Sequence, residues 1–295
     1  MKRPAAFVTA LALVAALCCR ASGPALAADQ EKQIGDQVYA DLSKKGEIIS
    51  HSPLYDVLNP IATRIKAVAD PQYEYPFKFI LVHEKQPNAF AVPGGNVYVT
   101  DSLMQFVKTK EELAGVLCHE TSHDIHHDVV NIMKKQQNVA IGATLLELLL
   151  GRGQSGLTNL AINMAANIQA LSFSRPVETA ADLKGSDTCA EAGFNPYGMI
   201  WLFDRFEKAG TGKGAMEALS DHPRDDHRIA DLENHFAQNP QRFGRFAKDV
   251  RYGTPLPQVL SHEYEERPSA AGTSLPKEPA QTTTGEYAPD PAATN

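Results

Sequence analysis

Apolar residues recur every three or four positions along most of this 295-residue chain, and this spacing predicts a mainly helical protein. Alternating apolar residues predict two strands, over residues 77–82 and 96–100, the second entered through a Pro93-Gly94-Gly95 turn. We therefore expect an α+β domain, mostly helical, with a short β-sheet. The expected helices cover residues 29–45, 54–68, 101–106, 129–150, 157–171, 176–192, 195–208 and 225–238, and a further helix begins after residue 109.

The helix that begins after Thr109 carries the string His119-Glu120-Thr121-Ser122-His123. Positions four apart lie on one face of a helix, about 6 Å apart along its axis. Two imidazoles so placed can hold one Zn²⁺, and Glu120 can act as the base toward a water on the metal. Thr109-Lys110-Glu111-Glu112 reads as a capping box that starts this helix. The alternative is a surface helix that happens to be rich in histidine.

A hydrolytic zinc site takes three protein ligands, so a third must come from elsewhere in the chain. Glu178 and Asp182 lie four apart on a predicted helix with small residues between them. Glu178 could bind the metal while Asp182 holds the outer nitrogen of a ligand histidine. The alternative is a pair of solvated acids on an exposed helix.

Peptide hydrolysis also needs donors for the developing oxyanion, and Asp221-His222-Pro223 offers one. His222 precedes a proline and therefore lies in extended chain, and Arg228 follows six residues later. The alternative is a surface histidine beside a surface arginine.

Residues 1–27 read as a secretory signal peptide, with a basic start, an apolar stretch and the cleavage pattern Ala25-Leu26-Ala27. An uncleaved anchor is the alternative, although the apolar stretch is short for a membrane span. Cleavage removes three of 28 basic residues, leaving 25 against 35 acidic residues and a net charge of −10. Nucleic acid and anionic membranes are therefore unexpected partners.

The two cysteines beyond the signal peptide are Cys118 and Cys189. An exported protein could pair them. Cys189, however, lies eleven residues past Glu178, about 16 Å along a continuous helix, so we expect two buried thiols. The apolar run 139–150 is read as a buried helix, with a lid or membrane-facing patch as the alternative. Beyond residue 252 prolines become frequent, which predicts a disordered tail over 253–295 and leaves 28–252 as the folded domain.

Four separated strings together resemble one family, the HtpX/BepA/LoiP-like zinc metallopeptidases, relatives of the CAAX prenyl proteases. The strings are His119–His123, Ser174-Arg175 with Glu178 and Asp182, Asn88-Ala89-Phe90-Ala91-Val92-Pro93-Gly94-Gly95, and His222-Pro223 with Arg228. The resemblance implies a small gluzincin fold with one Zn²⁺ held by His119, His123 and Glu178, and with Glu120 as the base.

The resemblance also implies roles for residues around the metal. Asp182 and Arg228 would support the ligands, and His222 would stabilise the oxyanion or occupy the open metal position at rest. The segment 90–99 would line the cleft and bind a peptide as an added strand, with four residues in contact with substrate: Phe90, Ala91, Val97 and Val99.

One position departs from the family pattern. The family often has a histidine five residues after the second ligand, and here that residue is Asp128. His126 and His127 precede it and are interpreted as surface residues at a helix end.

Exported members of the family act on misfolded or stalled outer-membrane proteins, so the resemblance implies a periplasmic endopeptidase, associated with the outer membrane, that cleaves polypeptides. The chain has no transmembrane pattern beyond the signal peptide. Two alternatives are a zinc-stabilised binding protein with little proteolysis and a structural metal module. Glu120 favours catalysis, because a module that only binds needs ligands but no base.

Overall fold

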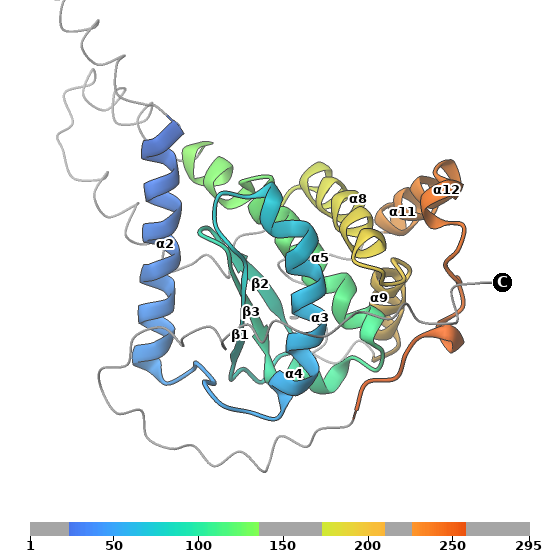
Figure 1. Cartoon of the computed structure of the whole chain (residues 1–295), viewed down its shortest axis with the longest axis horizontal. Coiled ribbons are helices and arrows are strands. Elements are labelled where there is room, and N and C mark those ends of the chain that lie inside the picture. The colour runs from blue at the N-terminus through green and yellow to red at the C-terminus, as the bar shows by residue number, and fades with distance from the viewer. Residues whose placement is uncertain (1–23, 136–172, 210–225, 258–295) are drawn as a thin grey trace, which may run out of the picture. The chain divides into compact units, whose positions relative to one another are not determined.

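The computed structural model describes residues 24–135, 173–209 and 226–257, and all of them lie within one unit of the chain (Figure 1). Several predicted features lie outside the described residues. They are most of the signal peptide 1–27, the apolar run 139–150, the helix 157–171, His222 and the tail from residue 258.

Helices make up most of the described chain, as the apolar spacing predicts. They are α2 (Pro24–Lys45), α3 (Leu54–Ala69), α4 (Asp101–Phe106), α5 (Lys110–Ile125), α8 (Arg175–Glu191), α9 (Gly198–Ala209), α11 (Asp226–Gln238) and α12 (Pro240–Phe243), with 3₁₀ turns η2 (Asp70–Gln72) and η4 (Val250–Tyr252). A further helix begins at Asp128 and reaches residue 135, where the described segment ends. Within the described segments, no helix combines the length and the apolar character that a membrane span needs.

Three strands form one small sheet in the order β1-β3-β2. β1 (Lys78–Val82) pairs in parallel with β3 (Asn96–Thr100), and β2 (Ala89–Val92) pairs antiparallel with β3. β1 and β3 were predicted, whereas the pattern of apolar residues did not predict β2. The reason is that all four β2 residues are apolar and buried, so the segment lacks the alternation that marks a half-exposed strand.

The two faces of the sheet pack against different helices. Val97 and Val99 face the main core, which includes the apolar side chains of α3 and α5. Phe90, Val92 and Tyr98 face the opposite way and form a second cluster with apolar residues of α2. The sheet therefore lies between α2 and the helix that carries the histidines, as Figure 1 shows.

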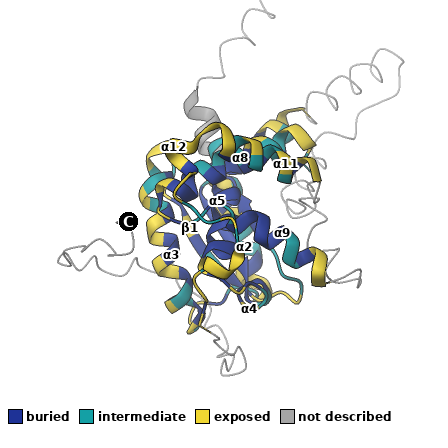
Figure 2. Cartoon of the chain, turned by 90° about the vertical axis from the view of Figure 1, so that its right-hand side faces the viewer, coloured by how far each residue is buried: buried dark blue, intermediate teal, exposed yellow. Residues whose placement is uncertain are grey.

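Helix α5 is the central element of the fold, and Figure 2 shows how deeply it is buried. It starts at the predicted capping box, in which the Thr109 side chain accepts from the Glu112 backbone and Glu112 accepts from the Thr109 backbone. Helix α8 packs closely against α5. A Cβ added at Gly185 would lie only 3.0 Å from the backbone nitrogen of His119. The absence of a side chain at this position allows the two backbones to approach each other.

The segment after η4 returns to the start of α5. The Lys110 N–H donates to the Thr254 carbonyl, and Glu111 accepts from the backbone and hydroxyl of Thr254. Leu256 is buried, and its N–H donates to the Lys108 carbonyl. The chain thus stays packed on the domain a few residues beyond position 252, where the proline pattern placed the boundary.

Candidate metal centre

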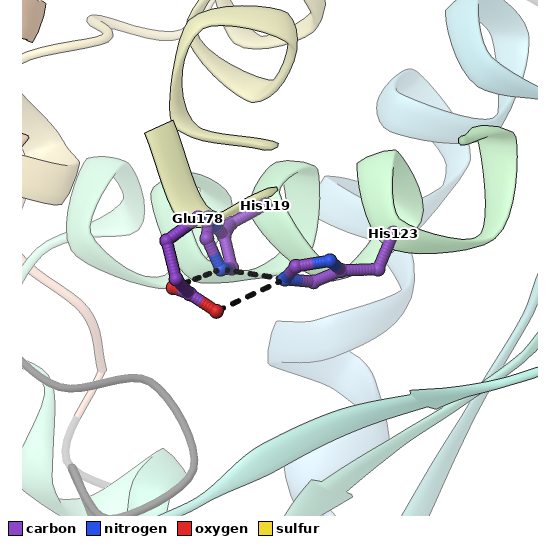
Figure 3. Close-up of side chains that lie close together, drawn as sticks. All are labelled: His119, His123 and Glu178. Carbon is purple, nitrogen blue, oxygen red and sulfur yellow. Dashed lines mark hydrogen bonds and ion pairs between the residues drawn. The ribbon is translucent and has the colours of Figure 1, made fainter. Parts of the chain in front are cut away.

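Helices α5 and α8 bring three potential metal ligands together. His119 and His123 lie one turn apart on α5, and Glu178 lies in the first turn of α8 (Figure 3). The two Nε2 atoms are 3.1 Å apart, and the Glu178 oxygens lie 3.6 Å from His119 Nε2 and 3.7 Å from His123 Nε2. All three side chains are buried.

The donor set fits one zinc ion. Zn–N and Zn–O bonds of about 2.0–2.2 Å in a tetrahedral site place neighbouring ligand atoms about 3.3 Å apart. The three observed separations bracket this value. Two imidazoles and one carboxylate are also the ligands of a hydrolytic zinc site with one open position.

A carboxylate holds the outer nitrogen of each histidine. Asp182 Oδ1 lies 2.9 Å from His119 Nδ1, which is the predicted contact. Asp128 Oδ2 lies 2.8 Å from His123 Nδ1, and this contact was not predicted. Each carboxylate favours the tautomer that carries its proton on Nδ1, so that Nε2 can act as the donor atom toward a metal.

Arg228, on α11, connects the carboxylates of α8. Its Nε and Nη2 donate to Asp182 at 2.6 and 2.7 Å, and its Nη1 lies 2.7 Å from Glu178. Burial alone would lower the pKa of Arg228, but the hydrogen bond with Asp182 and the charges of Asp182 and Glu178 raise it overall. The guanidinium is fully buried and contacts both Glu178 and Asp182, so it is placed to support these two carboxylates.

The carboxylates themselves titrate differently. Burial raises the pKa of Asp128 to about 6, with a further contribution from the charge of Glu178. Burial would also raise the pKa of Asp182, but hydrogen bonds from Arg228 and His119 outweigh it and lower that pKa. Asp182 is therefore kept ionised beside His119.

Glu120, the predicted base, directly follows His119 on α5 and contacts the sheet. It is buried, and its Oε2 accepts the backbone N–H of Ala91 at 3.0 Å. Ala91 belongs to β2, the edge strand next to α5, so its N–H points away from β3. The predicted base and the edge of the sheet are thus in direct contact.

Of the four residues expected to contact substrate, only Ala91 lies on the edge strand with its backbone N–H in contact with Glu120. Val97 and Val99 lie on the central strand β3 and are fully buried in the main core, so the expectation that they line a cleft is wrong. The Phe90 ring stacks on Tyr98 in the cluster under α2, on the other face of the sheet. Strand order decides these outcomes, since a central strand offers no free edge.

Two further histidines, His126 and His127, follow the motif closely in the sequence. His126 is partly exposed at the end of α5, as expected. His127 is partly buried and its Nδ1 lies 2.8 Å from Glu31, so its description as a surface residue is incomplete. Phe173 stacks on the His123 ring at a centroid distance of 4.3 Å, a contact that sequence spacing could not indicate.

Cys118 and Cys189 form a disulfide, so the expectation of two buried thiols is wrong. The distance of about 16 Å between Glu178 and Cys189 holds along α8 alone. The contacts His123–Glu178 and His119–Asp182 show that α5 and α8 run antiparallel, so moving along α8 toward Cys189 also moves back along α5 toward Cys118. Their Cα atoms are 5.9 Å apart, and the bond joins the two helices that carry the candidate ligands.

Residues 54–235 match the model of peptidase family M48. The beta-barrel assembly-enhancing protease of Yersinia pestis is 30% identical over 222 residues, which cover 72% of this chain and 45% of that protein. The protein of the same name from Escherichia coli K12 is 29% identical over 222 residues, with the same coverage. The mitochondrial metalloendopeptidase OMA1 of Schizosaccharomyces pombe is 30% identical over 213 residues, covering 70% of this chain and 60% of that protein. The chain thus spans less than half the length of these bacterial relatives.

Proposed function

The chain belongs to peptidase family M48, and we propose on this basis that it is a zinc-dependent endopeptidase. It would bind one Zn²⁺ per chain through His119, His123 and Glu178. The observation that carries the proposal is the convergence of these three donors with a fourth buried group, Glu120, that is not needed as a ligand. Zinc binding accounts for the three donors, and the additional buried carboxylate beside them favours hydrolysis over metal binding alone.

Held by these three residues, Zn²⁺ would supply Lewis-acid chemistry, lowering the pKa of water and polarising the scissile carbonyl. Glu120 takes a proton from the attacking water and later gives it to the leaving amine. Asp182 and Asp128 hold the imidazoles through their outer nitrogens, and Arg228 holds Asp182 and Glu178. These contacts fix the site before substrate arrives, so little reorganisation is needed during the reaction.

Polypeptide substrate would bind along β2 as an added strand. β2 is an edge strand, and the N–H of Ala91 that now reaches Glu120 is directed away from β3. A substrate carbonyl that accepted this N–H would lie beside the base and the metal ligands. An extended or unfolded segment can adopt this geometry, and a folded helix cannot.

The biological substrates proposed are misfolded or stalled envelope proteins, including outer-membrane proteins. Two bacterial relatives are named as proteases that enhance β-barrel assembly. Residues 1–27 would direct export to the periplasm, where the enzyme would act, associated with the outer membrane. His222 is proposed to stabilise the oxyanion, or to occupy the open metal position at rest.

The test is metal analysis combined with casein hydrolysis, comparing the wild-type protein with Glu120→Gln. Gln keeps the size and the hydrogen bond from Ala91 but cannot take a proton from water. We expect one zinc per chain in both proteins and activity in the wild type alone. Glu178→Ala is the control for the ligand set, and it should lose zinc as well as activity.

The alternative is a zinc-stabilised binding protein that captures unfolded chains without cleaving them. It predicts zinc in the wild type, no casein hydrolysis, and equal retention of an unfolded client by the wild type and Glu120→Gln. Turnover by Glu120→Gln within a few-fold of wild type would instead remove Glu120 from the role of base.

A further inference from the structure

A buried polar cluster joins α2 to the region of the metal centre. Glu31 of α2 is only 4% exposed. Its Oε2 accepts the Tyr73 hydroxyl at 2.5 Å, and its Oε1 lies 2.8 Å from His127 Nδ1. Glu31 precedes residues 54–235, which match the family model, so this contact adds an element outside the matched region.

The cluster reaches the turn between β2 and β3. The N–H of Gly94 donates to the Tyr73 hydroxyl at 3.0 Å, so Tyr73 bridges Glu31 and the turn. Gly94 has φ +97°, and a Cβ there would lie 3.0 Å from the Glu31 carbonyl oxygen. A Cβ at Gly35 would lie 2.6 Å from the Pro93 carbonyl oxygen. The backbone of α2 therefore touches the turn at two points.

This turn determines where β2 lies relative to the base. β2 has four residues, and Ala91, whose N–H contacts Glu120, is two residues before Pro93. The same Glu31 carboxylate binds His127, which lies just beyond the end of α5, four residues after His123. His127 has φ +54°. A non-glycine residue with a positive φ is uncommon, and surrounding contacts are needed to hold it in this left-handed conformation. Glu31 thus holds the edge strand and the end of α5 at once.

Stability alone gives little reason for a carboxylate here. Burying an ionisable group costs free energy, and well-packed apolar residues are often as stable as a buried charged pair. A carboxylate with two oxygens can, however, fix two donors from different segments at defined distances. Two other acids interact with the cluster. Glu74 Oε2 lies 3.8 Å from His127 Nε2. Burial raises the pKa of Asp124, and the charge of Glu31 raises it further.

We propose that Glu31 is a positioning residue for substrate binding, which fixes the β2 edge relative to α5 through Tyr73 and His127. The proposal rests on the proposed function, since the strand it positions is the one offered to the polypeptide. Loss of Glu31 would weaken peptide binding without removing a metal ligand or the base.

The test compares Glu31→Ala with Asp36→Ala, a control on the same helix that removes an exposed carboxylate paired with Lys32. On the zinc-loaded protein we measure zinc content, kcat and KM for a peptide, and hydrogen exchange over residues 89–96. For Glu31→Ala we expect full zinc content, kcat within about twofold, KM raised about fivefold, and faster exchange in β2; the KM change corresponds to about one lost hydrogen bond. Glu31→Gln should raise KM less than Glu31→Ala does, because its amide oxygen still accepts the Tyr73 hydroxyl.

Equal KM and equal exchange in Glu31→Ala and Asp36→Ala would overturn the proposal. So would a fall in kcat together with zinc loss, which would place Glu31 in support of the metal site and not of the edge strand. If Glu31→Ala does not fold, Tyr73→Phe is judged by the same criteria, because it removes the hydroxyl that donates to Glu31 and accepts from Gly94. Hydrogen exchange needs no turnover, so it decides the positioning role even if the wild type proves inactive and the proposed function fails.

Discussion

Asp128 Oδ2 lies 2.8 Å from the Nδ1 of His123, so the second histidine of the motif has its own carboxylate, as the first has Asp182. This contact exists because α5 ends before Asp128. The chain turns at His126 and His127, and a new helix begins at Asp128, which directs its side chain back to the His123 ring.

Asp128→Ala should weaken zinc binding by about 10- to 100-fold, the usual effect of removing such a partner. The measurement is competition for zinc with a chromophoric chelator. Asp128→Asn should lose less, because its amide oxygen still accepts from Nδ1. The exposed Asp36→Ala serves as the control, and zinc affinity equal to that of this control would show that Asp128 does not support the ligand.

The sequence predicted the pairs of candidate ligands and supporting residues that lie on one helix, because these pairs depend on local spacing, and the family resemblance implied that the two helices meet. His119 and His123 are one helical turn apart, Glu178 and Asp182 are one turn apart, and Thr109 with Glu112 is a local cap. The bounds of α4 and β3 also follow from local patterns, and the resemblance to the metallopeptidase family is confirmed.

Contacts that depend on the direction or order of distant elements could not be predicted. The disulfide requires antiparallel α5 and α8, and the burial of Val97 and Val99 requires β3 to be central. The pairing of Glu31 with Tyr73 joins residues 42 positions apart, and no spacing rule indicates it. Asp128 was missed because the direction of its side chain depends on the backbone turn at His126 and His127, where His127 has a positive φ.

Arg228→Leu should destabilise the protein by about 3–5 kcal/mol, because it leaves the buried carboxylates of Asp182 and Glu178 without their cation. The measurement is urea unfolding of the metal-free protein. Arg242→Ala is the matched control, since it breaks an ion pair with Asp187 at a largely exposed site and should cost less than about 1 kcal/mol. Equal losses in the two variants would contradict a supporting role for Arg228.

His222→Ala should open the site to chelators and also slow peptide cleavage. Neutral imidazole is a good metal ligand and protonated imidazole a good oxyanion partner, so one residue can serve at rest and during turnover. The two rates to measure are zinc loss to a chelator and turnover of a peptide. If both match the wild type, His222 is a surface histidine without a role in the reaction.

The disulfide between Cys118 and Cys189 should contribute both stability and metal retention. It closes a loop with a sequence separation of 71 residues, and the chain-entropy relation gives about 4 kcal/mol for a loop of this length. Cys118 also precedes the ligand His119, and the bond joins α5 to the helix of Glu178 and Asp182. We expect the double variant Cys118→Ala/Cys189→Ala to unfold at lower urea and to release zinc faster. Reductant should shift the wild type in the same direction and leave the double variant unchanged, which separates loss of the bond from loss of packing. A wild type whose urea midpoint and zinc release do not respond to reductant, with the thiols shown to be free by alkylation, would refute this role.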